Sequence, residues 1–265
     1  LPQESGHGSS GRRDRDAGSR STCMSDSQLQ AGTRKSELER NLAQINEAVA
    51  QAAKSAGRRS DDITVVAVTK TWPAADVRLL SDLGVTEFAE NKAQELMAKQ
   101  EVCADLALNW HFVGQLQRNK VKQVASVARC IESVDRPELV VALQERVQRD
   151  GLSPVTCLVQ VSLDHDRVAG RAGVAPDQAA RLADQVAATE GLELGGVMGV
   201  APRGGDARNA FETLKRVSEE ISDQHRSATI ISAGMSGDFV TAIKAGATHI
   251  RLGSALLGER VGFVR

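Results

Sequence analysis

The sequence contains few aromatic residues and lacks several motifs that would assign a function directly. Aromatic residues make up 3% of the 265 residues, and tyrosine is absent. Neither a GxxxxGK(S/T) nor an HExxH pattern occurs, which excludes the nucleotide and zinc-protease sites that those motifs define. No apolar run approaches the length of a membrane span, so we expect no membrane partner.

Charge and cysteine patterns exclude further classes of protein. The formal net charge is -1, with no basic stripe, so we expect no nucleic-acid partner. The four cysteines have no CxxC or Cys/His ligand spacing, which is typical of reduced thiols in a cytoplasmic protein. They are Cys23, Cys103, Cys130 and Cys157. Asp164, His165 and Asp166 resemble metal ligands, but consecutive loop residues rarely converge on one ion. We therefore predict no metal site.

The N-terminal stretch differs in composition from the rest of the chain. Residues 1–33 are rich in Gly, Ser, Arg, Asp and Gln and contain almost no apolar residues. Such a segment does not bury enough apolar surface to offset the entropy of ordering, so we expect residues 1–33 to be a disordered extension. It lacks the apolar core of a secretory signal. Met24 is a candidate natural start.

Alternating strand and helix patterns follow from residue 34 to residue 265. An amphipathic helix is expected over 36–56, before the first strand. The predicted strands are 63–69, 87–89, 109–113, 130–134, 155–161, 195–200, 229–232 and 249–252. Helices are expected to begin near Pro73, Asn91, Gln117, Pro137, Pro176, Asp206 and Ser236. Eight strand–helix units predict an α/β fold, a single (β/α)8 TIM barrel with an extra N-terminal helix.

Lys70 is the last residue of the run 63–70 and directly follows the first predicted strand, which is apolar and β-branched as in a buried parallel sheet. Val66, Val68 and Lys70 face one side of that strand. An amine at the C-terminal end of a barrel strand is a candidate for Schiff-base chemistry. Taken alone, however, Lys70 is better explained as a lysine that extends into solvent.

Two loops rich in glycine and serine follow the seventh and eighth predicted strands. The first contains Met235 and Ser236, and the second contains Gly253 and Ser254. In TIM barrels these two loops frequently bind phosphate, although each could be only a glycine turn with a helix cap. Two such loops at neighbouring strand ends, facing Lys70, indicate a phosphate-bearing ligand.

Arg251 on the eighth predicted strand alternates with Ile250 and Leu252, so we expect it to point into the barrel. A salt bridge to an inward carboxylate is an equally good explanation for it. A lysine, a phosphate cup and an inward arginine together suggest pyridoxal 5′-phosphate (PLP). Arg251 would then face the pyridine nitrogen and make the ring a weaker electron sink.

Six segments give the chain a resemblance to a known family. They are VAVTKT (66–71), FAENKAQE (88–95), WHFVGQLQRNK (110–120), SVD (133–135), GMSGDF (234–239) and RLGSALLG (251–258). The chain resembles the pyridoxal phosphate homeostasis protein family (YggS/PROSC type), whose barrel is similar to the N-terminal domain of alanine racemase. It departs from the family pattern at Lys92 and Ser162.

The resemblance implies a role for each candidate site residue. Lys70 would carry the Schiff base, and Ser236, Gly253 and Ser254 would hold the phosphate. Met235, Asn91 and His111 would line the pocket, with Arg251 at the pyridine nitrogen.

The resemblance implies a PLP-binding protein of vitamin B6 homeostasis that is expected not to be an enzyme. Its expected partners are PLP and PLP-dependent apo-enzymes, and we expect a monomer. The alternative is a PLP-dependent amino-acid racemase. In alanine racemases the base opposite the lysine is a tyrosine from a second domain, and this chain has none, although His111 or a cysteine could substitute for it.

Overall fold

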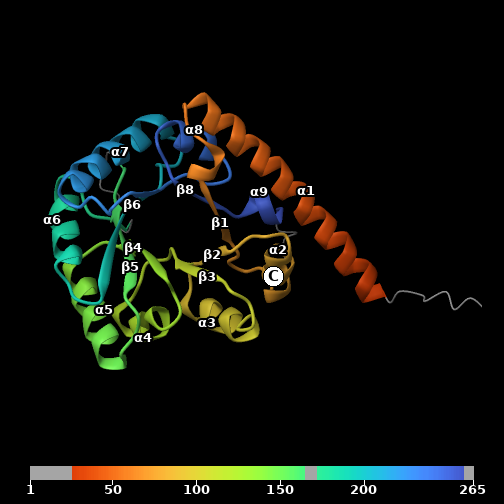
Figure 1. Ribbon diagram of the computed structural model, residues 1–265, viewed down its shortest axis with the longest axis horizontal. Helices are drawn as coiled ribbons and strands as arrows, with labels where there is room; N and C mark the ends of the chain where they lie inside the picture. The colour runs from red at the N-terminus through yellow and green to blue at the C-terminus, as the bar shows by residue number, and fades with distance from the viewer. Residues whose placement is uncertain (1–25, 165–171, 260–265) are drawn as a thin grey trace, which may run out of the picture.

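The computed structural model describes residues 26–164 and 172–259, in which eight parallel strands form a closed barrel. Each strand pairs with its sequence neighbours, and β1 closes the ring against β8 (Figure 1). The strands are β1 Thr64–Val68, β2 Glu87–Glu90, β3 Asn109–Phe112, β4 Cys130–Val134, β5 Val155–Val161, β6 Leu192–Gly199, β7 Ile230–Ser232 and β8 His249–Leu252. The predicted TIM barrel is confirmed.

Helices surround the barrel on its outside (Figure 1). The helices are α1 Asp26–Ser55, α2 Ala74–Asp82, α3 Ala93–Val102, α4 Val121–Ala125, α5 Pro137–Asp150, α6 Pro176–Ala187, α7 Ala207–Gln224, α8 Phe239–Lys244 and α9 Ser254–Leu257, with 3-10 turns η1 Ser60–Asp62 and η2 Arg118–Lys120. Pro137 and Pro176 occupy first turns as predicted, because proline already has a helical φ there. Asp206 caps α7 by accepting from the backbone N–H groups of Arg208 and Asn209.

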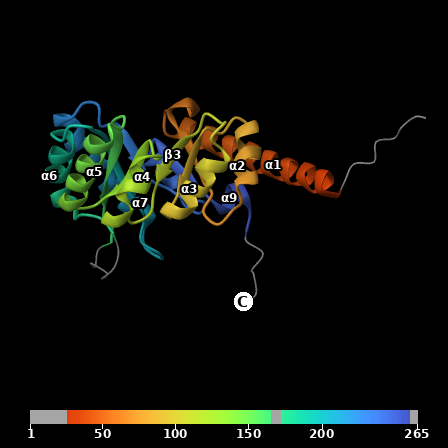
Figure 2. The same cartoon turned by 90° about the horizontal axis from the view of Figure 1, so that it is seen from below.

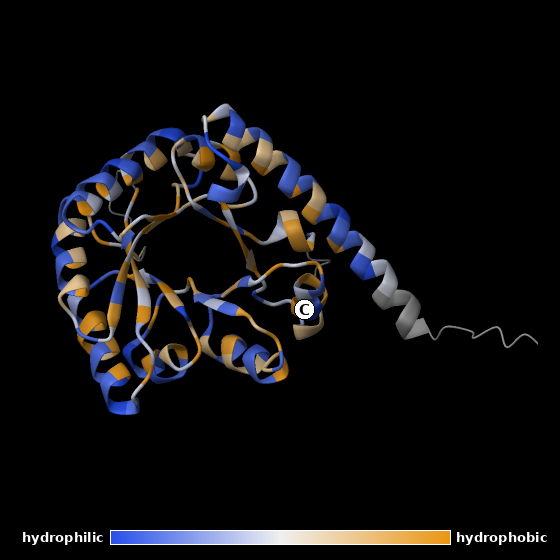
Figure 3. Cartoon of the chain, in the orientation of Figure 1, coloured by the Kyte–Doolittle hydropathy of each residue, from blue (hydrophilic) through white to orange (hydrophobic). Residues whose placement is uncertain are grey.

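The main hydrophobic core lies between the strands and the helices. The helices turn their apolar sides toward the barrel and their polar sides outward (Figure 3). A much smaller apolar cluster of Cys130, Leu158 and Met198 forms separately from this core. Much of the remaining barrel interior is filled by polar and charged side chains, described below.

Helix α1 differs from the expected N-terminal boundary. It begins at Asp26, so residues 26–33, which we expected to be disordered, are helical. Extending a helix that is already formed costs far less than starting one, so α1 continues outward from its packed part. Its N-terminal end projects beyond the barrel in two perpendicular views (Figures 1 and 2). Met24 lies outside the described residues.

Strand β6 begins at Leu192, three residues before the predicted start at Gly195. The register of β5 against β6 shifts between Cys157 and Leu158. Next to this irregularity Gly196 has a φ of 144°, and a Cβ atom there would collide with the backbone of Ile230. Glycine therefore permits the bulge, whereas the sequence pattern suggested that the strand started there.

No helix within residues 26–164 and 172–259 is long and apolar enough to cross a membrane. His165 and Asp166, which were considered as metal ligands, lie outside the described residues.

Candidate functional site

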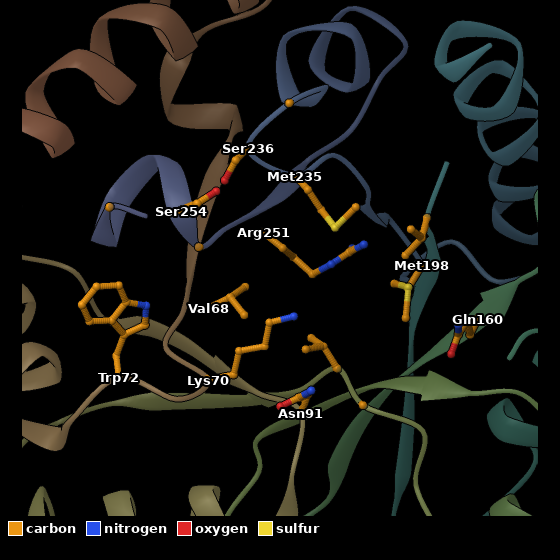
Figure 4. A pocket seen from close by; sticks show the side chains of 16 residues that line it. Val68, Lys70, Trp72, Asn91, Gln160, Met198, Met235, Ser236, Arg251 and Ser254 are labelled. Carbon is orange, nitrogen blue, oxygen red and sulfur yellow. The ribbon is translucent and has the colours of Figure 1, made fainter. Parts of the chain in front are cut away.

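A cavity of about 520 Å³ opens at the C-terminal ends of the strands (Figure 4). Its lining residues come from β1, β5, β6 and β8 and from the segments that follow β1, β2, β3, β6, β7 and β8. This is the end of a TIM barrel where active and binding sites are built. The volume is within the range that holds a small organic ligand. The cavity is therefore the candidate functional site.

Lys70 projects into this cavity from the end of β1 (Figure 4). Val68 lines the same cavity, while Ala67 belongs to the outer hydrophobic core, so the predicted alternation along the strand is confirmed. The Lys70 side chain makes no hydrogen bond or ion pair with any described residue and is solvent-exposed. The primary amine of Lys70 therefore lies at the cavity without a hydrogen-bond or ion-pair partner among the described residues.

Ser236 and Ser254 lie together on one side of the cavity (Figure 4), and Gly253, next to Ser254 in the chain, also lines it. The turn after β7 requires glycine at position 234, because its φ is 91° and a Cβ atom would lie 2.7 Å from the side chain of Ala242. The Ser236 hydroxyl accepts a hydrogen bond from the backbone N–H of Ala255, 3.0 Å away. This bond joins the two loops that were predicted to form one cup.

The expected helix cap by Ser236 is wrong. Helix α8 begins at Phe239, and Asp238 stands at its N-cap position. The Asp238 carboxylate accepts from the backbone N–H of Met235 at 2.6 Å and so closes the turn before the helix. Ser236 is consequently held toward the loop after β8, with Met235 beside it on the cavity wall.

Arg251 points into the barrel and lines the cavity, as predicted. Its guanidinium donates to the Ser232 hydroxyl at 2.6 Å and to the carbonyl oxygen of Gly199 at 3.0 Å. Its Nη1 also lies 3.6 Å from Glu132 Oε2. Glu132 is therefore the inward carboxylate that would explain Arg251 as a salt-bridge residue. The arginine also lies on the cavity wall, so both explanations for its position are met.

His111 does not line the cavity, which corrects our expectation for this residue. It is buried in the barrel interior, where Nδ1 lies 2.7 Å from Glu132 Oε1 and Nε2 lies 2.9 Å from Glu87 Oε2. Burial by itself would lower the pKa of His111, but contacts with Cys130 and the two carboxylates raise it well above its usual value. His111 is therefore a buried cation that neutralises carboxylates.

Glu132 connects the His111 cluster to the cavity wall. It is fully buried and accepts a hydrogen bond from Ser232 at 2.6 Å, in addition to its contacts with His111 and Arg251. Burial alone would raise the pKa of this carboxyl, but the hydrogen bond and charge of His111 and the charge of Arg251 lower it to about 2. The result is a continuous polar chain from Glu87 through His111 and Glu132 to Arg251.

Three members of this neighbourhood have the chemistry of metal ligands. The donor atoms of His111, Cys130 and Glu132 lie within 4.8 Å of one another, the one such group found among the described residues. The Arg251 guanidinium next to Glu132 and the protonated His111 already supply positive charge there. These charges oppose a divalent cation, so the absence of a metal site remains our prediction.

Asn91 follows β2 and lines the cavity, as predicted. Its Oδ1 atom is buried and has no hydrogen-bond partner among the described residues. Five other buried side-chain atoms that do not line the cavity also lack a partner among the described residues, so this atom alone does not indicate a ligand. The amine of Lys70, the guanidinium of Arg251 and the two serine hydroxyls on the cavity wall fit a ligand that carries an aldehyde, a ring and a phosphate.

Sequence reasoning missed several residues of the site. Trp72, Gln160 and Met198 also line the cavity, and Ser232 and Glu132 hold Arg251 in place. A signal was available for Glu132, because a charged residue in the middle of the fully buried strand β4 requires a partner. No comparable signal marks Gln160 or Met198, since polar and apolar residues both occur on the inner faces of barrel strands.

Comparisons with known proteins place this barrel and cavity in a class. A model of the family "Alanine racemase, N-terminal domain" matches residues 35–261. An alanine racemase from Clostridium difficile has the same fold, with a TM-score of 0.67 at 14% identity. The alignment covers 86% of this chain but 58% of the racemase. By fold and cavity the protein is a barrel of the alanine racemase N-terminal type.

Two further comparisons are more specific. The pyridoxal phosphate homeostasis protein of Mycobacterium leprae is 39% identical over 244 residues, covering 86% of this chain and 94% of that protein. The PipY protein of Synechococcus elongatus, whose structure was determined with PLP bound, is 30% identical with a TM-score of 0.69. That alignment covers 79% of this chain and all (100%) of PipY. The chain belongs to the pyridoxal phosphate homeostasis protein family, as its sequence motifs predicted.

Proposed function

We propose that this protein binds PLP covalently on Lys70 and takes part in intracellular PLP homeostasis. The observation that carries the proposal is the free Lys70 amine in a cavity that also presents Arg251 and the Ser236–Ser254 cup. When bound, PLP supplies an aldehyde that reacts with primary amines and a pyridine ring that accepts electrons. Lys70 Nζ would form a C=N bond to the aldehyde carbon, and the aldehyde oxygen would leave as water.

The two hydroxyls and Gly253 would bind the phosphate, and the wall around Asn91 and Met235 would hold the ring. Arg251 would face the pyridine nitrogen. A guanidinium donates hydrogen bonds and does not give up its proton at ordinary pH, so it favours an unprotonated ring nitrogen. Its fixed contacts with Ser232 and Gly199 keep it in that position. The arrangement favours retention of the cofactor over carbanion chemistry.

The racemase alternative lacks a second base in the cavity. The described lining contains no imidazole, thiol, phenol or carboxylate. His111, the candidate substitute, has both ring nitrogens on buried carboxylates. Cys130 and Cys157 are buried, and burial is the largest of the effects that raise the pKa of both thiols. These observations and the family favour the homeostasis role.

Lys70→Ala tests the function directly. We expect the purified protein to show an absorbance band at about 420 nm that borohydride removes. After reduction, the modified peptide should contain Lys70. Lys70→Ala should lose the band entirely, and Lys122→Ala, which alters an exposed lysine outside the cavity, should keep it. A band that persists in Lys70→Ala would mean that the wrong lysine was chosen. Racemisation of an amino acid with excess PLP, abolished by Lys70→Ala, would instead establish the enzyme alternative.

We further propose that the protein acts in the cytoplasm as a monomer and delivers PLP to PLP-dependent apo-enzymes. The cytoplasmic location is supported by the three buried free thiols among the described residues, and delivery by the placement of the cavity at the C-terminal ends of the strands. Light scattering of the purified protein tests the monomer. Delivery is tested by reactivation of an apo-enzyme in the presence of a scavenger of free PLP. Loss of reactivation when the scavenger is present would contradict direct delivery.

A further inference from the structure

The backbone immediately after Lys70 is in a conformation that its sequence disfavours. Thr71 has a φ of 67°, and it is the one non-glycine residue with positive φ among residues 26–164 and 172–259. A β-branched residue in the left-handed region is strained and needs external support. Part of the account is local: the backbone N–H of Trp72 donates to the carbonyl oxygen of Thr69 at 2.9 Å and closes a turn in which Thr71 is the third residue, where positive φ is usual.

Helix α3 supplies a contact that supports this conformation. The Glu95 carboxylate accepts a hydrogen bond from the backbone N–H of Thr71, with a distance of 2.6 Å to Oε2. Lys92 lies 3.3 Å from the other Glu95 oxygen and keeps the carboxylate in place. The Thr71 hydroxyl donates to the carbonyl oxygen of Lys70 at 2.5 Å. Thr71 is therefore bonded both to the helix and to the residue that carries the amine.

The same helix also holds the residue before Lys70. Lys99 Nζ donates to the carbonyl oxygen of Thr69 at 2.6 Å and pairs with Glu90, and both side chains are buried. The Thr69 hydroxyl donates to Glu90 at 2.7 Å. Glu95 and Lys99 are four residues apart and so lie on one face of α3. The helix thus fixes the backbone on both sides of Lys70.

The direction of the Lys70 side chain depends on this backbone. Since the amine has no polar partner among the described residues, no side-chain contact orients it. If Thr71 relaxed to negative φ, the peptide group between Lys70 and Thr71 would rotate and the amine would enter the cavity at another angle. The Lys99–Glu90 pair is buried and would hold the fold in any case, whereas the side chain of Glu95 is 25% exposed and its backbone contact is with Thr71.

We propose that Glu95 is a positioning residue: by accepting the Thr71 N–H it keeps Thr71 left-handed and aims Lys70 at its ligand. This inference rests on the proposed role of Lys70 in binding PLP. Glu95 itself does not touch the cavity. Its effect should therefore appear in the rate of covalent capture and in the backbone angle of Thr71.

The test compares Glu95→Ala, Glu95→Gln and the control Glu101→Ala, an exposed carboxylate on the same helix. Stopped-flow absorbance measures how fast each apo-protein reacts with added PLP. We expect Glu95→Ala to slow capture about ten-fold or more, since small misplacements of a reacting group have effects of this size. Glu95→Gln should remain close to wild type because its amide oxygen also accepts the bond. Glu101→Ala should not change the rate.

A second variant separates backbone geometry from general loss of structure. Asparagine tolerates the left-handed region better than threonine, so Glu95→Ala with Thr71→Asn should recover most of the lost rate. The scalar coupling between the amide and α protons of residue 71, measured in the apo-protein, should report a changed φ in Glu95→Ala and a restored one in the double variant. Thermal unfolding confirms that each variant is folded.

The outcomes distinguish this inference from the proposed function. If Glu95→Ala captures PLP at the wild-type rate while Lys70→Ala captures none, the positioning role is wrong and the binding function stands. A double variant as slow as Glu95→Ala would also overturn the positioning role. If Lys70→Ala still forms the borohydride-reducible adduct, the proposed function itself fails.

Discussion

Lys70 at the mouth of the barrel and Glu132 in its interior both carry charge at barrel strands, but their surroundings differ. Glu132 is fully buried, and its contacts with His111, Ser232 and Arg251 satisfy it. Lys70 is exposed and has no polar partner among the described residues. Close to it, the buried Oδ1 of Asn91 also lacks a partner within the described chain.

The interior charges stabilise the fold by pairing with one another, whereas the polar groups at the mouth are available to bind a ligand. A buried charge without a partner is expensive, so the interior charges neutralise one another. At the mouth, water or a ligand can satisfy the amine and the hydroxyls, so they need no internal partner. Arg251 belongs to both regions, because Glu132 neutralises it from one side while the other side lines the cavity.

Removing the charge of Glu132 should have the largest effect on stability. Glu132→Gln keeps the shape of the side chain but removes its negative charge. His111 then has only the carboxylate of Glu87 beside it, and Arg251 loses the carboxylate that neutralises it. We expect the free energy of unfolding at pH 7 to fall by about 3 kcal/mol, as for other buried ion pairs that lose one partner. Chemical denaturation measures the change, and Glu193→Gln, an exposed glutamate on β6, is the control.

The pH dependence of that loss follows from the pKa of Glu132. Its pKa is lowered from 4.5 to about 2, so the ionised carboxylate contributes stability above pH 4.5 and the contribution disappears as the pH falls toward 2. Wild type and Glu132→Gln should therefore converge in stability over this range. A difference that stayed constant down to pH 3 would show that the charge of Glu132 is not what stabilises the interior.

At the mouth, the corresponding change should affect ligand binding more than stability, which loses the bond from the Ala255 N–H to Ser236, worth about 1 kcal/mol. Ser236→Ala with Ser254→Ala removes two hydroxyl donors to the proposed phosphate. A hydrogen bond to a charged group contributes about 1.5 kcal/mol, so we expect PLP affinity to fall about a hundred-fold. Equilibrium dialysis measures it, with Ser126→Ala and Ser222→Ala as the surface control. Unchanged affinity would remove the phosphate assignment.

How far the sequence could predict these two regions depends on what strand alternation determines. Alternation gives the face of a strand, so Lys70, Arg251 and the loops after β7 and β8 were placed correctly at the cavity. It does not give depth within the barrel. His111 faces inward, but it pairs in register with Cys130 and lies beside Glu87, away from the cavity. Because barrel strands are tilted and staggered, depth depends on the register of all eight strands.

The backbone at Thr71 and the role of Ser236 were unpredictable for a different reason. A threonine is a poor choice for positive φ, so no local rule points to a left-handed residue there. The turn closed by the Trp72 N–H on the carbonyl oxygen of Thr69 and the tertiary contact with Glu95 both accompany it. Ser236 has the chemistry of a helix cap, but Asp238 closes the turn and α8 begins later. At Thr71 the preference of threonine for negative φ is outweighed, and a hydrogen bond to Glu95 accompanies the change. At Ser236 the preference of serine for a helix cap is outweighed by the hydrogen bond from Met235 to Asp238.

Helix α1 offers the last and smallest test, because it supports the mouth from outside the barrel. Arg34 donates to the carbonyl oxygen of Leu257 at 3.0 Å, pairs with Asp76 at 2.9 Å and stacks on Trp72 with its guanidinium carbon 4.6 Å from the ring centroid. These contacts hold the segment after β8 and a residue of the cavity wall.

Arg34→Ala should lower the free energy of unfolding by about 1 kcal/mol, since these partly buried contacts are worth less than the enclosed pairs of Glu132. It should also speed the release of PLP a few-fold, because the segment that carries Ser254 loses an anchor. Lys35→Ala is the matched control, since Lys35 is exposed and its partner Asp82 lies 3.9 Å away. If Arg34→Ala destabilised the protein as much as Glu132→Gln, the mouth would be as firmly built as the interior, and the distinction between the two regions would fail.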